Sequence, residues 1–419
     1  MTQMSRTMAA ITPVGPGVFF TQPAPHQGCA WPRVVTAIPS QRRFHRMCSQ
    51  YPLLSMSHAA DSSSPSLTGW RRYTGAFAIL GTLAGSAYAG APPLPALGAD
   101  LNQTSVSGIS SGGFMASQLA TAYSGAFVGA GIIAGGPFYC AGSIPGVPFM
   151  QNALTTCMMP VGSANAPNAE VAWKQAQELA KTGAIDAVAN LRTQRVYLFS
   201  GANDPTVKTL VVDQAANYYQ LAGTPDQHLK YIKNLFTGHA IMTNDEEDVP
   251  CPVTAPPFIN NCGFEQSQDI LRHIYGELQP PVAREELSGR ILNFDQGEFV
   301  KGTRTSMSDQ GFAYIPKSCE TEACKVHVAI HGCLQYAENM GDKFYTGTGY
   351  NEIADTNKII VLYPQTKVSK PMNPKGCWDF WGYSDENPKV PVFYTKDAPQ
   401  MSAIMAMVRR LGEPRPPAY

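Results

Sequence analysis

The sequence predicts an α/β protein in which helices cover a mostly parallel sheet. Two observations lead to this prediction. Short apolar runs alternate with helical patterns from residue 101 onward, which is typical of parallel sheets covered by helices. The chain has 419 residues, of which 44% are hydrophobic, so it can bury a large core. No internal repeat or low-complexity linker follows residue 89, and we expect 90–419 to form a single domain.

The elements can be placed by their hydrophobic patterns. A less regular segment follows residue 276, before the strand pattern resumes. A last helical pattern covers 401–411, shortly before the end of the sequence. The expected strands are 103–107, 128–133, 195–199, 229–235, 325–330 and 359–363. The other expected helices are 114–123, 168–181, 209–222 and 264–277.

The N-terminal part has a different character. Residues 1–69 are rich in Ser, Pro and Gln without sustained periodicity, so we expect a disordered or mis-assigned extension. A basic pair at 71–72, an apolar run at 75–84 and an Ala-Tyr-Ala cleavage motif together predict a signal peptide over 70–89. The run is too short to span a bilayer. The sequence predicts export, to the periplasm or out of the cell, without a membrane anchor after cleavage; a membrane-anchored or differently targeted precursor is the alternative.

The charge balance narrows the range of partners. Lys and Arg together number 31, as do Asp and Glu, so the net charge is zero and nothing indicates a nucleic-acid partner. Only 15% of residues are charged, while there are 18 Tyr and 18 Phe, a composition that suits uncharged substrates. No cysteine pair has zinc-finger spacing, and we expect neither a metal nor a cofactor.

The cysteine count agrees with export. Two of the ten cysteines, Cys29 and Cys48, precede the cleavage motif, and the remaining eight form an even set that predicts disulfides. Eight cysteines allow roughly a hundred pairings, so the connectivity stays open. Sequence neighbours suggest the pairs Cys140–Cys157, Cys251–Cys262, Cys319–Cys324 and Cys333–Cys377.

A Gly-x-Ser-x-Gly pattern places a candidate nucleophile, Ser110, between a strand pattern and a helical one. In such a turn the serine is held in a strained conformation, and Gly108 and Gly112 leave room where side chains would collide. The N–H of Ser111 then faces a developing oxyanion. A plain Gly/Ser-rich turn is the alternative, but the apolar stripe within 115–122 indicates a helix where the motif requires one.

A serine nucleophile needs a base and an orienting carboxylate. Asp204 follows the strand expected at 195–199, and His239 follows the one at 229–235. The order Ser, Asp, His, each just past a strand, favours a catalytic triad over an Asx-type turn and a structural histidine. Asp213 and His273 lie in helical patterns, and His228 precedes its strand. The competing candidates are Asp213, Asp245, His228 and His273.

The second oxyanion donor is out of its usual place in the chain. A strand followed by His-Gly ordinarily precedes the nucleophile. Here the strand expected at 325–330 leads into His331, Gly332 and Cys333, far behind Ser110. We therefore expect a circularly permuted α/β-hydrolase fold, with the Cys333 N–H as the second donor and a disulfide holding its loop. A plain β-turn at His331-Gly332 is the alternative.

These motifs together resemble the extracellular poly(3-hydroxybutyrate) depolymerases, in the branch with a circularly permuted catalytic domain and an N-terminal lipase box. The resemblance implies Ser110 as nucleophile, with Asp204 and His239 as its partners. It implies Ser111 and Cys333 as oxyanion donors. It also places Trp378 or Trp381 on a polymer-binding surface, whereas the alternative is that both are partly buried scaffold residues. The motifs that carry the resemblance are 108–113, 200–207, 238–239, 331–335 and 376–382.

The resemblance implies a secreted serine esterase that hydrolyses poly(3-hydroxybutyrate) or related short-chain polyhydroxyalkanoates through an acyl-enzyme. Its partners would be solid or amorphous polyester and the hydroxyacid oligomers released from it, and we expect a monomer. Many relatives append a separate polymer-binding domain, which we do not expect in 90–419. Two alternatives remain: an esterase for feruloyl, acetyl or short soluble esters with the same triad, and a non-catalytic exported binding protein on a hydrolase scaffold.

Overall fold

The computed structural model describes residues 90–417, so the expected extension at 1–69 and signal peptide at 70–89 lie outside the described residues. An eight-stranded sheet runs through the molecule in the order β4-β3-β2-β1-β10-β11-β9-β8. All its strands are parallel except β9, which is antiparallel to both its neighbours. The strands are β1 (Thr104–Ile109), β2 (Phe127–Ile133), β3 (Arg195–Phe199), β4 (Leu229–Ile232), β8 (Arg290–Asp295), β9 (Gln310–Ile315), β10 (Lys325–Ile330) and β11 (Ile359–Tyr363).

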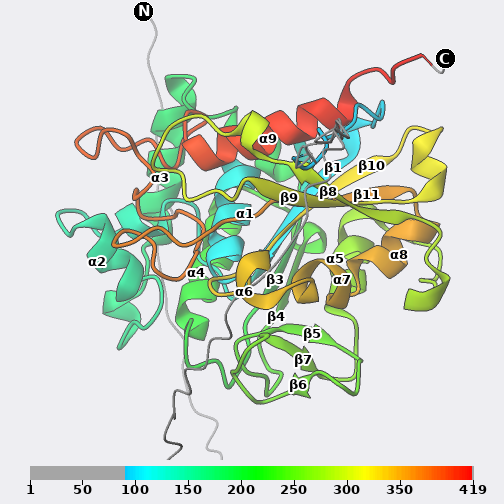
Figure 1. Cartoon of the computed structure of the whole chain (residues 1–419). Coiled ribbons are helices and arrows are strands. Elements are labelled where there is room, and N and C mark those ends of the chain that lie inside the picture. The colour runs from blue at the N-terminus through cyan, green and yellow to red at the C-terminus, as the bar shows by residue number, and fades with distance from the viewer. Residues whose placement is uncertain (1–89, 418–419) are drawn as a thin grey trace, which may run out of the picture. The chain divides into compact units, whose positions relative to one another are not determined.

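Helices cover both faces of this sheet, with α1 and α9 on one side and α5 and α8 on the other (Figure 1). The α/β-hydrolase fold predicted from the sequence is confirmed. A second, three-stranded sheet consists of β5 (Ile241–Thr243), β7 (Ile259–Asn261) and β6 (Val249–Pro250). The helices are α1 (Ser111–Ala122), α2 (Phe149–Leu154), α3 (Ala169–Lys181), α4 (Thr209–Leu221), α5 (Gln266–Tyr275), α6 (Ala337–Met340), α7 (Lys343–Gly347), α8 (Tyr350–Thr356) and α9 (Pro399–Gly412).

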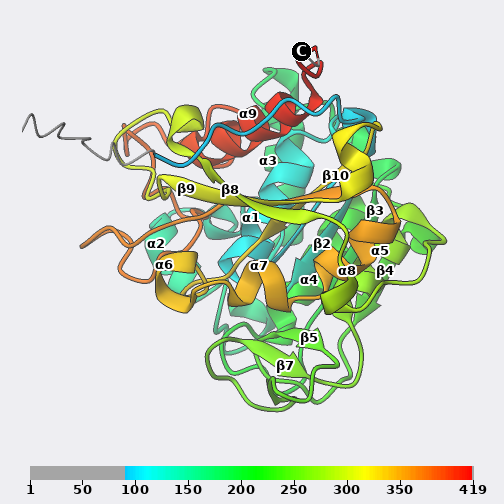
Figure 2. The same ribbon diagram turned by 45° about the vertical axis from the view of Figure 1, so that its right-hand side comes forward.

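The first strand of the chain lies at the centre of the sheet rather than at an edge. β1 pairs with β2 on one side and with β10 on the other, where Gly108 is in register with Ile330. The two ends of the described chain also meet, because the N–H groups of Leu97 and Ala99 both donate to the carbonyl of Leu411 at 3.1 and 3.0 Å. Figure 2 shows the segment before β1 running alongside α9. This arrangement is what a circular permutation produces.

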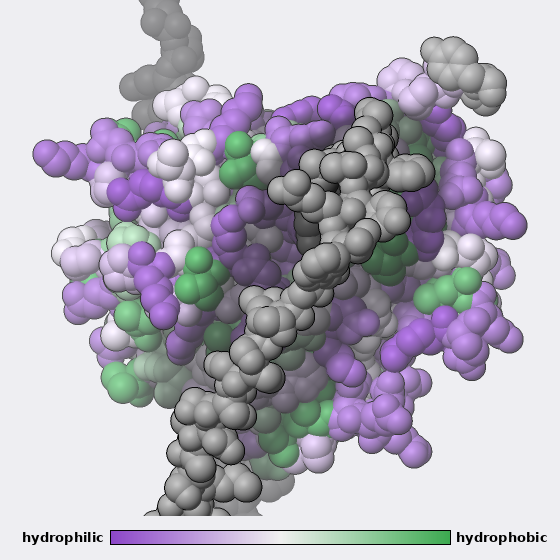
Figure 3. Space-filling view, viewed as in Figure 1, coloured by the Kyte–Doolittle hydropathy of each residue, from purple (hydrophilic) through white to green (hydrophobic). Residues whose placement is uncertain are grey.

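Burial explains why the central elements have nearly continuous apolar sequences. Every residue of β1 and β11 is buried, as parallel strands covered on both faces require. All twelve residues of α1 are buried as well. On the face shown in Figure 3, polar side chains predominate and apolar ones are scattered. Within residues 90–417, no helix has both the length and the apolar character needed to cross a membrane.

The expected disulfides are confirmed, and the four pairs match those suggested by sequence neighbours. Three of them close loops at the same end of the sheet. Cys140–Cys157 encloses α2, and Cys251–Cys262 spans the small sheet that follows His239. Cys333–Cys377 joins the loop after β10 to the loop that contains Trp378 and Trp381. Cross-links of this kind stabilise a fold chiefly by restricting the unfolded chain.

Candidate active site

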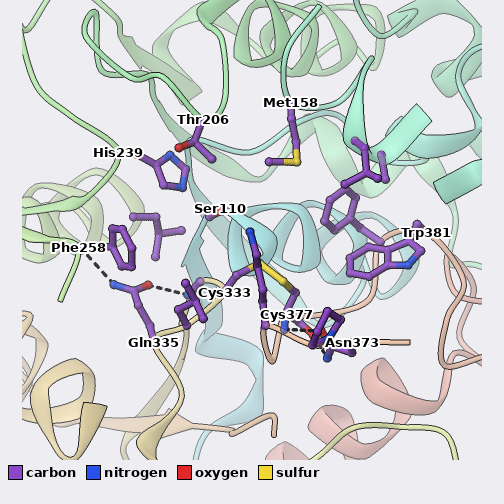
Figure 4. Close-up of a pocket in the computed structure, with 18 of the residues that line it drawn as sticks. Ser110, Met158, Thr206, His239, Phe258, Cys333, Gln335, Asn373, Cys377 and Trp381 are labelled. Atoms are coloured by element: carbon purple, nitrogen blue, oxygen red, sulfur yellow. Dashed lines mark hydrogen bonds between the residues drawn. A yellow bond between two sulfur atoms is a disulfide. The ribbon is translucent and has the colours of Figure 1, made fainter. Parts of the chain in front are cut away.

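A cavity of about 430 Å³ opens where several parallel strands end, and most of its lining is apolar. Ser110 follows β1 and Cys333 follows β10, while His239 lies on the loop after β4. Figure 4 shows these three residues around the same space. In open α/β sheets, ligands bind outside the carboxyl ends of the strands, so this is the expected position for a site.

The turn from β1 into α1 holds Ser110 in an unusual conformation. Its φ of 57° and ψ of −124° lie outside the regions that most residues adopt, and such strain is common at functional sites. The flanking glycines are required by close packing. A Cβ on Gly108 would lie 2.3 Å from the carbonyl oxygen of Gly112, and one on Gly112 would lie 2.3 Å from that of Ile330. At both positions neighbouring backbone occupies the space that a side chain would need, so only glycine fits, as predicted.

Replacing Gly112 by Ala should destabilise the protein, because the new methyl group would collide with the backbone of β10. We expect a loss of about 1–3 kcal/mol in the free energy of unfolding, the usual range for overpacking. Denaturation in urea would measure it. Gly162→Ala is the matched control, since a Cβ there meets nothing within 4 Å and its φ of −177° is extended. Equal stability of the two variants would contradict the tight packing.

Asp204 and His239 form a buried pair. The imidazole Nδ1 lies 2.7 Å from Asp204 Oδ2, and the side chains are only 1% and 8% exposed for Asp204 and His239. The other carboxylate oxygen, Oδ1, accepts the backbone N–H groups of Thr206 and Val207 at 2.7 and 3.0 Å. Two donors therefore hold one oxygen in place and leave the other for the imidazole. With Nδ1 protonated toward Asp204, His239 Nε2 is available as a base.

Packing also explains the glycine that precedes the histidine. A Cβ on Gly238 would lie 2.2 Å from the carbonyl oxygen of Val253, so only glycine fits there. The His239 N–H donates to Thr254 Oγ1 at 2.8 Å.

Within the described residues, no hydrogen bond joins Ser110 Oγ to His239, although both line the cavity. In unliganded sites such bonds are often long and tighten with substrate.

The competing acids and histidines lie elsewhere. Asp213 accepts from Tyr231 Oη and pairs with Lys233 Nζ at 2.8 Å. Asp245 approaches Arg284 at 3.5 Å. His273 Nε2 donates to the carbonyl of His228 at 2.9 Å. None of these four candidates lines the cavity.

Two backbone N–H groups near Ser110 have no acceptor among residues 90–417. Ser111 is the first residue of α1, where helical N–H groups have no partner within the helix. The Cys333 N–H has no acceptor among the described residues. Its peptide plane is fixed from the other side, because His331 Nδ1 donates to the Gly332 carbonyl of the same peptide at 2.7 Å. Burial lowers the pKa of His331 to about 4, so the ring is neutral near pH 7.

Gln335 holds the same loop and was assigned no role from the sequence. Its Oε1 accepts the Gly332 N–H at 2.7 Å, while its Nε2 donates to the carbonyls of Pro257 and Phe258 at 2.9 and 3.2 Å. The side chain thus connects the loop after β10 to the loop that precedes β7 (Figure 4). The sequence signal for this role was a glutamine two residues after Cys333. Its hydrogen-bond partners could not be predicted, because they depend on the tertiary structure.

The tryptophan prediction needs a correction. Trp378 is 0% exposed and its ring centroid lies 5.4 Å from that of His331, so it cannot lie on a polymer-binding surface. Its backbone N–H donates to Ser111 Oγ at 3.2 Å, which makes it part of the scaffold under the site. Trp381 is partly exposed and lines the cavity (Figure 4). The sequence motif could not distinguish the two because both lie in one aromatic run.

A serine in a strained strand-to-helix turn, a buried Asp–His pair and two unpaired amide N–H groups meet at the carboxyl ends of a parallel sheet. This combination of fold and site defines a serine hydrolase of the α/β-hydrolase class.

Comparison with known proteins narrows the class to a family. The chain is 34% identical over 345 residues to a polyhydroxybutyrate depolymerase of Talaromyces funiculosus, covering 94% of that protein. It is 41% identical over 324 residues to a poly(3-hydroxybutyrate) depolymerase of Delftia acidovorans, but spans only 61% of that relative's length. The chain belongs to the poly(3-hydroxybutyrate) depolymerase family.

Solved structures agree with this assignment. A PHB depolymerase from Penicillium funiculosum and a PHB depolymerase complexed with an R3HB trimer are each 31% identical to this chain. Their TM-scores are 0.66 and 0.67, and each comparison covers 76% of this chain and 98% of the other. No family model matches the sequence.

Proposed function

We propose that this protein hydrolyses the ester bonds of poly(3-hydroxybutyrate) or related short-chain polyhydroxyalkanoates. The observation that carries the proposal is the meeting of Ser110 and the Asp204–His239 pair at an apolar cavity. Membership of the depolymerase family supports the same substrate class. A polyester offers methyl groups and ester carbonyls without charge along its length, and an apolar cavity matches that chemistry.

The proposed reaction proceeds through an acyl-enzyme. Ser110 Oγ attacks the ester carbonyl carbon while His239 Nε2 accepts its proton, and Asp204 stabilises the resulting imidazolium. The N–H groups of Ser111 and Cys333 donate to the oxyanion, and each such donor contributes a few kcal/mol. The imidazolium then protonates the leaving alkoxide. Water, deprotonated by His239, attacks the acyl-enzyme and releases a carboxylic acid with Ser110 restored.

Exposed apolar side chains at the cavity support a polymeric substrate. Met150 and Leu154 on α2 are 50% and 59% exposed, and Met372 on the loop before Cys377 is 41% exposed. With Trp381 they offer flat or flexible apolar contacts to an uncharged chain. Of the two tryptophans predicted from the sequence, Trp381 remains the proposed substrate-binding residue.

The proposed function also includes the domain organisation, oligomeric state and location of the protein. Residues 90–419 act as one catalytic domain and work as a monomer. Export, directed by the signal peptide proposed at 70–89, delivers the protein to the solid or amorphous polyester, outside the cell or in the periplasm. The four disulfides support an oxidising location.

Loss of turbidity in a poly(3-hydroxybutyrate) suspension tests the function directly. We expect the chain beginning at Gly90 to clear the suspension and release hydroxyacid oligomers. Hydrolysis of p-nitrophenyl butyrate without clearing would instead favour the soluble-ester alternative, and feruloyl and acetyl substrates would then be compared. No hydrolysis of any ester would favour a binding protein on a hydrolase scaffold.

A further inference from the structure

The cavity contains one charge that the proposed reaction does not use. Lys375 lines it, and among the described residues of the lining it is, apart from His239, the one that can carry a positive charge; none of them is Asp, Glu or Arg. Among residues 90–417, no carboxylate pairs with its ammonium group and no acceptor lies within hydrogen-bonding distance. The other lining side chains are apolar or neutral. Because the Lys375 ammonium group is exposed and has no partner in the described part of the chain, it is free to bind an anion that enters the cavity.

The backbone that carries Lys375 is fixed beside the oxyanion loop. Its carbonyl accepts the N–H of Leu334 at 2.8 Å, one residue after Cys333. Two residues further along, Cys377 is disulfide-bonded to Cys333, and its N–H donates to Asn373 Oδ1 at 2.8 Å. The lysine therefore projects from a cross-linked segment whose position is tied to the oxyanion donor. Figure 4 shows Cys377 and Asn373 next to Cys333.

The chemistry of the polyester identifies where a negative charge can occur. Interior units are neutral esters, and only the carboxyl end of a chain is ionised near pH 7. The polymer has a direction: the acyl side of any ester leads toward the hydroxyl end, and the alcohol side leads toward the carboxyl end. A terminal carboxylate therefore always belongs to the leaving alcohol.

We propose that Lys375 is a binding site for the terminal carboxylate of the leaving fragment, so that the cavity favours ester bonds close to the carboxyl end of a chain. The site would take carboxylate-terminated hydroxyacid oligomers. This inference rests on the proposed function and adds an end preference to it. Because Lys375 is exposed, we expect a modest effect, about two- to fivefold in kcat/KM.

The test compares two trimers of 3-hydroxybutyrate as substrates. One ends in a free carboxylate and the other in a neutral carboxamide, so they differ chiefly in the charge of the terminal group. Chromatography of the released units gives kcat/KM for each at pH 7.5. We expect the wild type to prefer the acid by about two- to fivefold. Lys375→Met should bring the acid-to-amide ratio close to one, while Lys375→Arg should keep the preference. Lys370→Met is the matched control, because this exposed lysine lies outside the cavity.

The same ratio decides the outcome. Equal ratios for the wild type and Lys375→Met, with both trimers hydrolysed, would overturn the carboxylate site and leave the proposed function intact. A fall of the ratio in Lys370→Met as large as in Lys375→Met would also overturn it, since the effect would then reflect net charge alone. If the wild type hydrolyses neither trimer and does not clear the polymer, the proposed function and the carboxylate site fail together.

Discussion

Replacing Ser110 by Ala should lower kcat for p-nitrophenyl butyrate by about 10⁴- to 10⁶-fold, because it removes the hydroxyl that attacks the ester in the proposed reaction. The remaining rate would come from the oxyanion donors alone. Alanine is smaller than serine, so the strained turn should keep its shape and the thermal midpoint should change little.

Ser163→Ala is the matched control, since that serine is exposed in the loop before α3. It should retain full activity. Labelling with a fluorophosphonate probe should occur in the wild type and the control but not in Ser110→Ala. Near-wild-type hydrolysis by Ser110→Ala would remove Ser110 from the mechanism and with it the proposed acyl-enzyme.

Replacing Asp204 by Asn should lower kcat by about 10⁴-fold with little change in structure. The backbone N–H groups of Thr206 and Val207 require an oxygen at the Oδ1 position, so the new amide must direct its NH₂ toward His239. The imidazole then accepts at Nδ1 and carries its proton on Nε2, where it cannot take the proton of Ser110. Steady-state kinetics on p-nitrophenyl butyrate measure the loss.

The control for Asp204→Asn is Asp213→Asn. Asp213 was a competing candidate from the sequence, but it pairs with Lys233 and Tyr231 away from the cavity. The Asp213→Asn variant should keep its activity. It should lose at most a surface ion pair, which contributes about 0–1 kcal/mol to the free energy of unfolding. An equal loss of activity in both variants would show that the buried Asp204–His239 pair has no special role.

The sequence predicted the central sheet well because its strands are buried on both faces and read as apolar runs. It missed β8 and β9, where the segment after residue 276 looked irregular. β8 lies at the edge of the sheet and is mostly half-buried or exposed, so its apolar pattern is weak. The small sheet of β5, β6 and β7 also escaped, since strands of two or three residues carry no readable period. The strand predicted at 229–235 ends three residues early, at Ile232.

The sequence could predict those residues of the site whose positions depend on the ends of strands. Each of Ser110, Asp204 and His239 follows a strand, and parallel strands bring such positions to one edge. Contacts between residues far apart in the sequence could not be predicted. The clamp by Gln335 depends on a loop almost eighty residues away in sequence. The burial of Trp378 depends on α1 and the loop after β10, which no local pattern reveals.

The central position of β1 has a consequence for the order in which the protein can fold. Ser107 Oγ on β1 bonds the imidazole of His327 on β10, 220 residues away, so β1 leaves the ribosome long before β10 has been synthesised. Contacts of such high sequence separation slow folding and delay the last assembly steps. A nascent chain that ends before β10 already contains Ser110, Asp204 and His239 but lacks one of the two neighbours of β1, together with Cys333. Ser110 is thus made early, and the proposed active site is completed only when the last quarter of the chain, which contains β10 and Cys333, is being synthesised.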